Sequence, residues 1–205
     1  MSVVKLQHIH VIIMCKAPVA GQVKTRLMRR YSAEEAAALH MAMAERVIAR
    51  AKRLFDHVTI AADDPAHPFF AAFGLPLRAQ GAGDLGVRMQ RQIDAPFAAG
   101  AKGVLLLGTD SPHMADARLI EAAAALDAAD VVLGPVEDGG YDLIALAAAH
   151  NIFDGVAWSS ADVLRRSVAN AERQGLRVAL LSESFDVDTP ADLDRARDCI
   201  SMRES

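Results

Sequence analysis

Short apolar segments alternate with amphipathic helical segments along almost the whole chain. The first apolar segment, residues 10–15 (HVIIMC), is typical of a central strand that is buried on both faces. Further β-rich segments follow at residues 58–62, 75–79, 103–107, 131–134 and 177–181. Strands that alternate with helices predict a mostly parallel sheet with helices on both faces. We therefore expect residues 1–205 to form a single α/β domain, a Rossmann-like three-layer α/β/α sandwich.

Capping signals locate helices between these strands. Ser32, followed three residues later by Glu35, fits a capping box and opens a helix over residues 33–53. Ser159 and Asp162 form a similar start for a later helix. Helical connections of this length are what neighbouring parallel strands require.

One apolar segment does not fit the alternation. Residues 141–147 follow the strand at 131–134 after only a short turn, residues 137–140 (EDGG). Parallel neighbours need a crossover of a dozen or more residues, and this connection is too short for one. We therefore expect residues 141–147 to run antiparallel or to leave the main sheet.

The charge and hydropathy of the chain exclude two classes of partner. The formal net charge is −4 and the isoelectric point is near 6.0, whereas nucleic-acid phosphates select basic surfaces. No apolar stretch approaches the ~18 to 20 residues of a membrane span, and the first residues lack the features of a signal peptide. We expect a cytoplasmic protein with neither nucleic-acid nor membrane partners. A homodimer is compatible with the sequence.

Polar side chains gather where the predicted strands end. In open α/β sheets, ligands bind outside the carboxyl ends of the strands. The loop after the first strand is basic, a second loop is rich in glycine, and the later loops are acidic. The candidate nucleotide-binding residues are Lys16, Gly21, Lys24, Thr25, Arg26, Gln80, Gly83, Asp84 and Arg88, and the carboxylates of the later loops are Asp110, Glu137, Asp138, Asp186 and Asp188.

This combination of loops has a chemical meaning. A basic loop suits a polyphosphate, because glycine lets backbone N–H groups approach the phosphates closely. Mg²⁺ is usually held by one or two carboxylates together with substrate phosphate oxygens and water. Phosphoryl chemistry needs positioning and electrostatics more than a protein nucleophile, and the chain has no G-x-S-x-G motif. The sequence therefore predicts a site for a nucleotide and Mg²⁺.

Each of these features also has a structural explanation when it is taken alone. Lys24 is not part of a P-loop, because Val23 stands where that motif requires glycine. Asp110 could stabilise a turn, and Asp188 could belong to a helix start. Trp158 could simply pack against the core. What favours function is the order in which these residues follow successive strands.

Six segments, in this order, resemble one protein family. They are residues 16–27 (KAPVAGQVKTRL), 80–89 (QGAGDLGVRM), 107–112 (LGTDSP), 137–142 (EDGGYD), 158–159 (WS) and 186–193 (DVDTPADL). Together they resemble the nucleotide-diphospho-sugar transferase superfamily with the glycosyltransferase-A fold. Within it, the chain resembles a group described as glycosyltransferases and linked to arsenosugar biosynthesis and radical-SAM partners. It is similar, more distantly, to the molybdenum-cofactor and phospholactate guanylyltransferases.

The resemblance implies roles for particular residues. Gly21, Lys24 and Arg26 would hold the nucleotide phosphates, and the segment 80–88 would lie near the base or the ribose. The implied metal ligands are Asp110 and Asp188. The implied acceptor contacts are Glu137, Asp138, Tyr141 and Trp158.

Three functions remain open. We expect first a Mg²⁺-dependent nucleotidyltransferase that joins an NMP unit from an NTP to a small phosphorylated acceptor and releases pyrophosphate. The catalytic residues would then be Lys24 and Arg26, which stabilise the leaving group, and Asp110, which holds the metal. The second function is that of a glycosyltransferase with a nucleotide-diphospho-sugar donor. The third is that of a nucleotide-binding protein without turnover.

Overall fold

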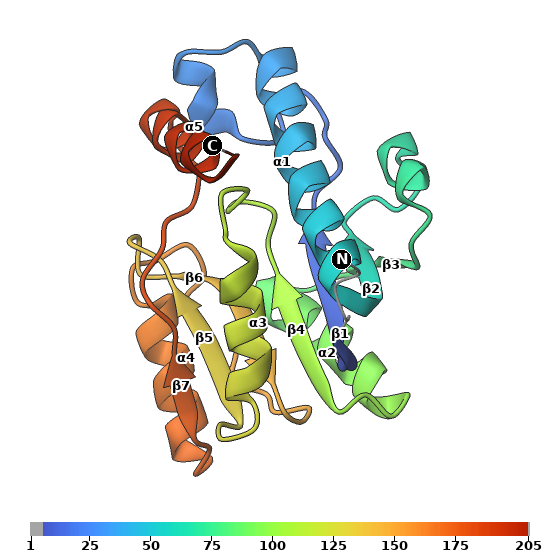
Figure 1. Ribbon diagram of the computed structural model, residues 1–205, viewed down its shortest axis with the longest axis vertical. Helices are drawn as coiled ribbons and strands as arrows, with labels where there is room; N and C mark the ends of the chain where they lie inside the picture. The colour runs from blue at the N-terminus through green and yellow to red at the C-terminus, as the bar shows by residue number, and fades with distance from the viewer. Residues whose placement is uncertain (1–5, 205) are drawn as a thin grey trace.

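A seven-stranded sheet forms the centre of the protein in the computed structural model, which describes the backbone of residues 6–204 and the side chains of residues 6–197. The strand order across the sheet is β3-β2-β1-β4-β6-β5-β7 (Figure 1). In chain order the strands are β1 (Leu6–Cys15), β2 (Phe55–Ala62), β3 (Leu77–Ala79), β4 (Gly103–Leu107), β5 (Val131–Pro135), β6 (Tyr141–Leu146) and β7 (Val178–Leu180).

Strand β6 is the antiparallel member of this sheet. It lies between β4 and β5 and pairs antiparallel with both, so that Ile144 is opposite Leu106 on one side and Leu133 on the other. The other neighbouring pairs, β1 with β2 and β4, β2 with β3, and β5 with β7, are parallel. The expectation of an antiparallel segment is confirmed, and the segment stays within the main sheet.

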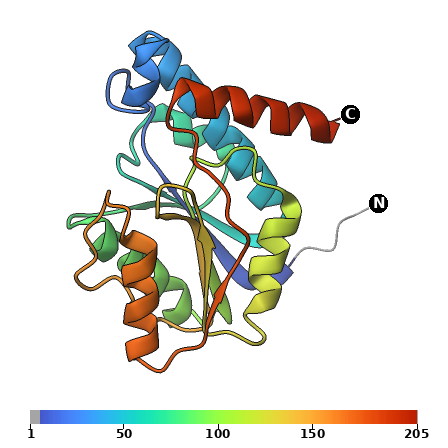
Figure 2. The same cartoon turned by 90° about the vertical axis from the view of Figure 1, so that its left-hand side faces the viewer.

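Helices cover both faces of the sheet, as the alternating pattern predicts (Figure 2). Helices α1 (Ala33–Leu54) and α3 (Asp116–Ala125) contribute to the core on one face. Helices α2 (Leu85–Ala98) and α4 (Val163–Arg173) contribute to the core on the other. The three-layer α/β/α architecture is therefore confirmed.

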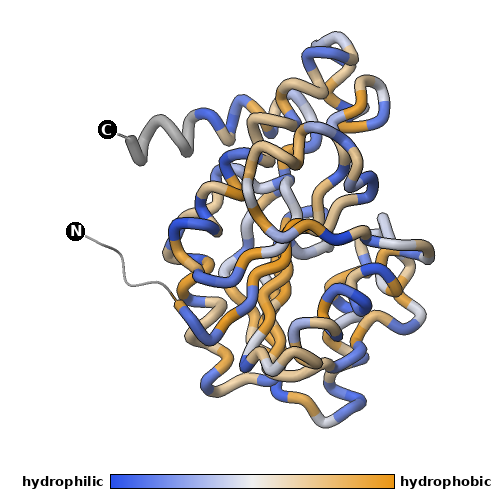
Figure 3. The backbone as a smooth tube through the Cα atoms, turned by 90° about the vertical axis from the view of Figure 1, so that its right-hand side faces the viewer, coloured by the Kyte–Doolittle hydropathy of each residue, from blue (hydrophilic) through white to orange (hydrophobic). Residues whose placement is uncertain are grey.

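The apolar character of β1 follows from its place between these two layers. Val11 and Ile13 belong to the core on the α1 side, whereas Ile12 belongs to the core on the α2 side. Successive side chains of a strand point to opposite faces, so a strand that is covered twice must be apolar at nearly every position. Figure 3 shows the hydrophobic segments concentrated in the strands at the centre of the molecule.

The helix starts agree only in part with the capping signals. The capping box is present at α1, where the Glu35 N–H donates to the Ser32 hydroxyl and the Ser32 N–H donates to the Glu35 carboxylate. The expected helix start at Ser159 is wrong. Ser159 has a positive φ of 64°, which a helix does not allow, and α4 begins only at Val163.

The C-terminal helix α5 (Pro190–Glu204) lies beside the segment that follows β1 (Figure 1). That segment forms a short 3₁₀ helix (Thr25–Arg29), where the sequence suggested a loop as far as Arg26. Leu27 from the 3₁₀ helix packs in a small cluster with Val187 and Leu193. This cluster brings the chain before α5 against the loop after β1. No helix within residues 6–204 is long and apolar enough to cross a membrane.

Candidate active site

A pocket of about 870 Å³ lies at the carboxyl ends of β1 and β4. This volume is in the range of small-molecule sites. Its lining comes from the loops after β1, β3 and β4, from the start of β6, and from the segments before α4 and α5. The candidate residues that line it are Lys16, Lys24, Thr25, Arg26, Gln80, Arg88, Asp110, Asp138, Tyr141, Trp158, Asp186 and Asp188.

Four candidate residues are not among those that line the pocket. Gly21 adopts a positive φ of 79° in the turn after β1. Asp84 is the N-cap of α2 and accepts a hydrogen bond from the Val87 N–H, and Gly83 packs against the Val87 side chain. Glu137 forms an ion pair with Arg195, with both N–O distances at 2.9 Å. These contacts are structural, and the predicted ligand contacts of the four residues stay predictions.

Lys24 lies between the two carboxylates that the sequence pairs as metal ligands. Its Nζ atom is 2.7 Å from Asp110 Oδ1 and 3.2 Å from Asp188 Oδ1, and it donates a third hydrogen bond of 2.7 Å to the Val187 carbonyl oxygen. An ammonium group has three hydrogens, so all its donors are used. The predicted contact between Lys24 and a phosphate would therefore require the ammonium group to break one of these three hydrogen bonds.

The electrostatics of Lys24 reflect this arrangement. The side chain is only 6% exposed. Burial lowers the pKa of Lys24, but the carboxylates of Asp110 and Asp188 outweigh this effect, and the pKa lies above its ordinary value. The lysine is therefore charged, and the backbone that carries it has a positive φ of 46°, which is rare for a residue with a side chain.

The carboxylates themselves remain open to the pocket. The side chains of Asp110 and Asp188 are 45% and 36% exposed. Asp188 also accepts a hydrogen bond of 2.6 Å from Arg26, whose side chain is 65% exposed. The exposed guanidinium of Arg26 and the exposed Lys16 are therefore the cations on this side of the pocket that can reach a phosphate group.

A backbone hydrogen bond and the Ser111 side chain join the segment before α5 to the loop after β4. The Val187 N–H donates to the Asp110 carbonyl oxygen at 2.8 Å. Two residues later, the N–H and hydroxyl of Thr189 both donate to the Asp192 carboxylate, which fixes the start of α5. The loops that carry Asp110 and Asp188 are thus hydrogen-bonded to each other and to the start of α5.

The pair Asp110 and Asp188 fits one divalent cation in its chemistry. Both carboxylates contact the same nitrogen atom, so they are close enough to share one positive ion. Among the described residues, no group of three or more His, Cys, Asp or Glu side chains could hold a metal by itself. Mg²⁺ and Mn²⁺ accept oxygen ligands, and Mg²⁺ typically takes only one or two carboxylates with substrate phosphates and water. A metal here would therefore be completed by the nucleotide.

Two further carboxylates reach the pocket. Ser111 donates a hydrogen bond of 2.6 Å to Asp186, and burial, opposed by this hydrogen bond, raises the pKa of Asp186 to about 7. Asp142 is paired with Arg118 through two bonds of 3.0 Å, and burial raises its pKa. The sequence did not single out Ser111, Asp142 or Arg118 as site residues. The two pocket residues, Ser111 and Asp142, lie inside the motifs 107–112 and 137–142, which are the signal that could have found them.

Gln80, at the start of the glycine-rich loop, and the first turn of α2 form one wall of the pocket. The side-chain amide of Gln80 is buried and donates to the carbonyl oxygens of Cys15 and Ala61, while its oxygen accepts from Arg88. Arg91 ties the loop to α2 by donating to the Gln80 carbonyl oxygen at 2.6 Å. Both amide hydrogens of Gln80 are therefore used within the protein.

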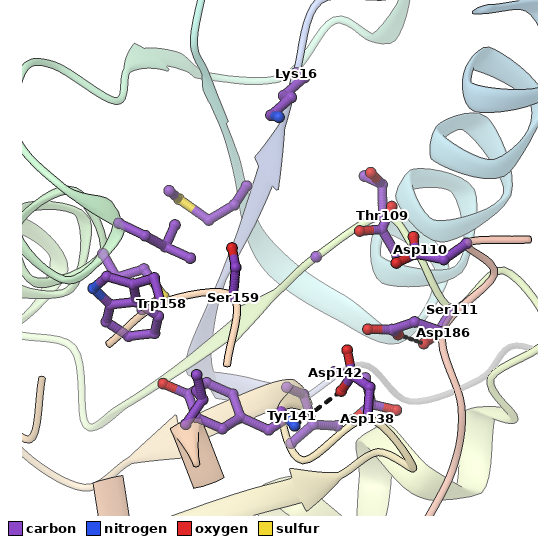
Figure 4. Close-up of a pocket in the computed structure, with 18 of the residues that line it drawn as sticks. Lys16, Thr109, Asp110, Ser111, Asp138, Tyr141, Asp142, Trp158, Ser159 and Asp186 are labelled. Carbon is purple, nitrogen blue, oxygen red and sulfur yellow. Dashed lines mark hydrogen bonds between the residues drawn. The ribbon is translucent and has the colours of Figure 1, made fainter. Parts of the chain in front are cut away.

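Tyr141 and Trp158 form the opposite wall, across the pocket from Lys16 (Figure 4). Trp158 packs near Phe153, at 6.1 Å between ring centroids, and against Gly86, where a Cβ atom would collide with the indole. The loop that carries Trp158 is held by Gly139, whose carbonyl oxygen accepts a hydrogen bond from Leu164 at the start of α4. This wall is therefore tied to both β6 and α4.

Comparison with known proteins identifies related sequences and folds. Residues 44–160 match the family described as "Uncharacterized protein conserved in bacteria (DUF2064)". The chain is 30% identical to a "putative nucleotide-diphospho-sugar transferase" from Desulfovibrio desulfuricans G20, and the match covers 90% of this chain and 84% of that one with a TM-score of 0.83. No curated protein matches the chain.

Two more distant structures share the fold alone. A CMP:2-keto-3-deoxy-manno-octonic acid synthetase in complex with CTP is 14% identical, with a TM-score of 0.62 over 95% of this chain and 99% of that one. Rv0371c from Mycobacterium tuberculosis H37Rv, in complex with manganese, is 20% identical, with a TM-score of 0.54 over 93% and 98%. The three solved structures therefore share the architecture of this chain.

Proposed function

This chain belongs to the bacterial family described as "Uncharacterized protein conserved in bacteria (DUF2064)", and we propose that it is a metal-dependent transferase that acts on a nucleotide. One observation carries the proposal. Asp110 and Asp188, from distant parts of the chain, converge on one cation site in a pocket at the carboxyl ends of the strands. That is where open α/β sheets bind their ligands.

The comparisons support both halves of this proposal. The relative at 30% identity is described as a "putative nucleotide-diphospho-sugar transferase". Of the two more distant structures described above, one was solved with CTP and the other with manganese. A nucleotide and a divalent cation are the two ligands for which the exposed cations and the paired carboxylates of this pocket are suited.

The first candidate reaction is nucleotidyl transfer from an NTP. An acceptor oxygen would form a bond to the α-phosphorus, and the bond to the β-phosphate oxygen would break, so that pyrophosphate leaves with the bonding electrons. Arg26 and Lys16 would bind the phosphates, and Asp110 and Asp188 would hold Mg²⁺. When bound, the metal would neutralise charge on the phosphate oxygens.

The second candidate reaction is glycosyl transfer from a nucleotide-diphospho-sugar. The description of the relative from Desulfovibrio desulfuricans favours it. The same residues would bind the diphosphate, but the bond that breaks would join the sugar carbon to the phosphate oxygen. A nucleoside diphosphate would then be the leaving group.

A donor screen followed by product analysis tests the proposal. Thermal unfolding with NTPs and nucleotide sugars, with and without Mg²⁺, identifies the donor, because a bound ligand raises stability by mass action. Pyrophosphate released from an NTP indicates nucleotidyl transfer, and a nucleoside diphosphate from an activated sugar indicates glycosyl transfer. Nucleotide binding without any product would contradict the proposal that the chain is an enzyme.

The variant Asp110→Ala tests the metal role of this carboxylate. Its turnover should fall by about 10²-fold or more, and a wild-type rate would refute that role.

A further inference from the structure

The two halves of the pocket differ in charge. The cationic side chains that line it come from the loop after β1 and from α2, namely Lys16, Lys24, Arg26 and Arg88. The other half is formed by the turn before β6, by β6 itself and by the loop before α4. No lysine or arginine of these segments is among the described residues that line the pocket.

The charged groups in this second half are carboxylates. Asp138 is exposed at its rim, and its Oδ1 accepts a hydrogen bond from the Gly140 N–H. Asp142 lies deeper and is held by Arg118. The Arg118 guanidinium is only 9% exposed, and it also donates to the Ser182 and Pro135 carbonyl oxygens. Its hydrogen bonds are therefore made within the protein, and its positive charge is paired with Asp142.

Most of the remaining surface of this half is apolar, and Leu106 of the neighbouring strand β4 extends it. Leu106 and Ile144 are cross-strand partners on β4 and β6, and both belong to the core between the sheet and helices α2 and α4. They line the pocket together with Tyr141, Trp158 and Val163. The Tyr141 hydroxyl accepts a hydrogen bond from the buried Ser167, and burial raises its pKa. The phenol group is thus turned toward α4, and the ring contributes apolar surface.

Two serines of the loop before α4 line this half, and the Ser160 hydroxyl is occupied by the Ala157 carbonyl oxygen. Figure 4 shows the Ser159 side chain between Trp158 and Asp110, pointing into the pocket. Ser159 is exposed and has a positive φ of 64°, so the loop places its hydroxyl here at a conformational cost. A serine hydroxyl both donates and accepts, which suits another hydroxyl group.

From these observations we infer the chemical class of the acceptor: an uncharged, hydroxyl-bearing molecule with an aromatic or aliphatic body, and not the phosphorylated molecule that the sequence suggested. The body would lie on Leu106, Ile144 and the rings of Tyr141 and Trp158. A phosphate in this half would meet Asp138 with no protein cation beside it, which is unfavourable. This inference rests on the proposed function, because it assigns the first half to the nucleotide.

The chemistry of the transfer balances with such an acceptor. The acceptor hydroxyl oxygen forms the new bond to the α-phosphorus, or to the sugar carbon in the second candidate reaction. The hydroxyl proton is released to water. Pyrophosphate or the nucleoside diphosphate leaves with the electrons of the broken bond, and no oxidant or reductant is required.

The single tryptophan of the chain gives a direct measurement. Because Trp158 lines this half, its fluorescence reports occupancy by a small probe. We would titrate the full chain, with saturating nucleotide and Mg²⁺ so that the cations of the first half are occupied, with 4-phenylbutanol and with 4-phenylbutyl phosphate, which differ only in the phosphate group. We expect the alcohol to bind at least about tenfold more tightly than the phosphate ester. Equal or tighter binding of the ester, or no binding of either probe, would overturn the inference.

A charge variant with a matched control locates the effect. In Asp138→Asn, the amide oxygen can still accept from the Gly140 N–H, and the ester should bind about twofold to fivefold more tightly with the alcohol unchanged. Asp162→Asn makes the same change at a carboxylate that pairs with Arg165 outside the pocket lining, and neither probe should respond. An Asp138→Asn variant that leaves the ester affinity unchanged would also overturn the inference.

A nucleotide titration separates this inference from the proposed function. The same protein is titrated with NTPs and nucleotide sugars in the presence of Mg²⁺. If no nucleotide binds, the proposed function fails, whatever the probes do. If a nucleotide binds but the phosphate ester is preferred over the alcohol, only the acceptor class is wrong.

Discussion

The ammonium nitrogen of Lys24 lies 2.7 Å from the Asp110 carboxylate, and the same nitrogen contacts Asp188. A buried cation thus lies where two carboxylates would hold a divalent metal. Like charges that share a site repel, so the lysine stabilises the pair while no metal is bound. The same positive charge would compete with a metal for the carboxylates.

Removing this charge should therefore increase metal affinity. In Lys24→Met, we expect Mn²⁺ to bind roughly tenfold more tightly without nucleotide, because no ammonium needs to be displaced. Electron paramagnetic resonance of free Mn²⁺ measures this affinity. Lys16→Met removes an exposed lysine from the same pocket and should change the affinity little. Weaker Mn²⁺ binding by Lys24→Met than by the wild type would contradict competition.

The turn before β6 depends on the absence of a side chain at one position. Gly139 has a φ of 86°, and a Cβ atom there would collide with the Ala161 carbonyl oxygen. We expect Gly139→Ala to lower the free energy of unfolding by about 2–3 kcal/mol. Gly155→Ala is the control, because Gly155 has a similar φ of 65° but open space around it. Urea unfolding should show a smaller loss of stability for Gly155→Ala. Equal losses in the two variants would show that the collision with Ala161 does not contribute.

The buried pair of Arg118 and Asp142 should be costly to break. Arg118→Met leaves the Asp142 carboxylate buried without its cation, which costs about 3–5 kcal/mol in comparable pairs. The double variant with Asp142→Leu removes both charges and should recover most of this loss. Urea unfolding of the two variants measures the difference. A double variant as unstable as Arg118→Met would show that repacking, and not the unpaired charge, causes the loss.

Asp186 should make stability fall with rising pH. Its folded-state pKa, near 7, lies above the ordinary value of 3.8, so the unfolded chain loses this proton at lower pH than the folded one. The protonated Asp186 carboxyl therefore contributes fully to the free energy of unfolding below about pH 4, and this contribution is lost as the pH rises toward 7. In Asp186→Asn the amide oxygen still accepts from Ser111, and no proton is lost.

The comparison is made by urea unfolding at pH 4.5 and pH 7.5. As the pH rises from 4.5 to 7.5, the free energy of unfolding of Asp186→Asn should increase by about 1–3 kcal/mol relative to that of the wild type. The exposed Asp162→Asn serves as the control for general charge effects. A difference between Asp186→Asn and the wild type that does not change with pH would contradict the raised pKa.

Much of the fold could be predicted because its signals are local. The apolar segment at 10–15 indicates a strand covered on both faces, and β1 has that environment. The short connection before residue 141 indicates an antiparallel strand, because no crossover fits it. The start of α4 could not be predicted in this way. Ser159 resembles a helix cap in sequence, but its backbone conformation is set by the packing of its loop.

The site could be predicted as a set of segments but not as a set of contacts. The order of the strands brings the loops with Lys24, Asp110 and Asp188 together, and this follows from topology. The difference between Asp138, which lines the pocket, and Glu137, which pairs with Arg195, depends on how the turn at residues 137–140 is oriented. The engagement of Lys24 by three oxygens depends on the position of α5, which no local pattern contains.

The most direct test of the central claim is the dependence of nucleotide affinity on Mg²⁺ in the wild type and in Asp188→Asn. Isothermal titration calorimetry with the donor from the screen measures both, and Asp162→Asn is the matched control. Mg²⁺ should tighten nucleotide binding by roughly tenfold or more in the wild type and the control, because metal and phosphates complete one site. In Asp188→Asn this gain should disappear. An undiminished gain in Asp188→Asn would contradict the assignment of the metal to Asp110 and Asp188.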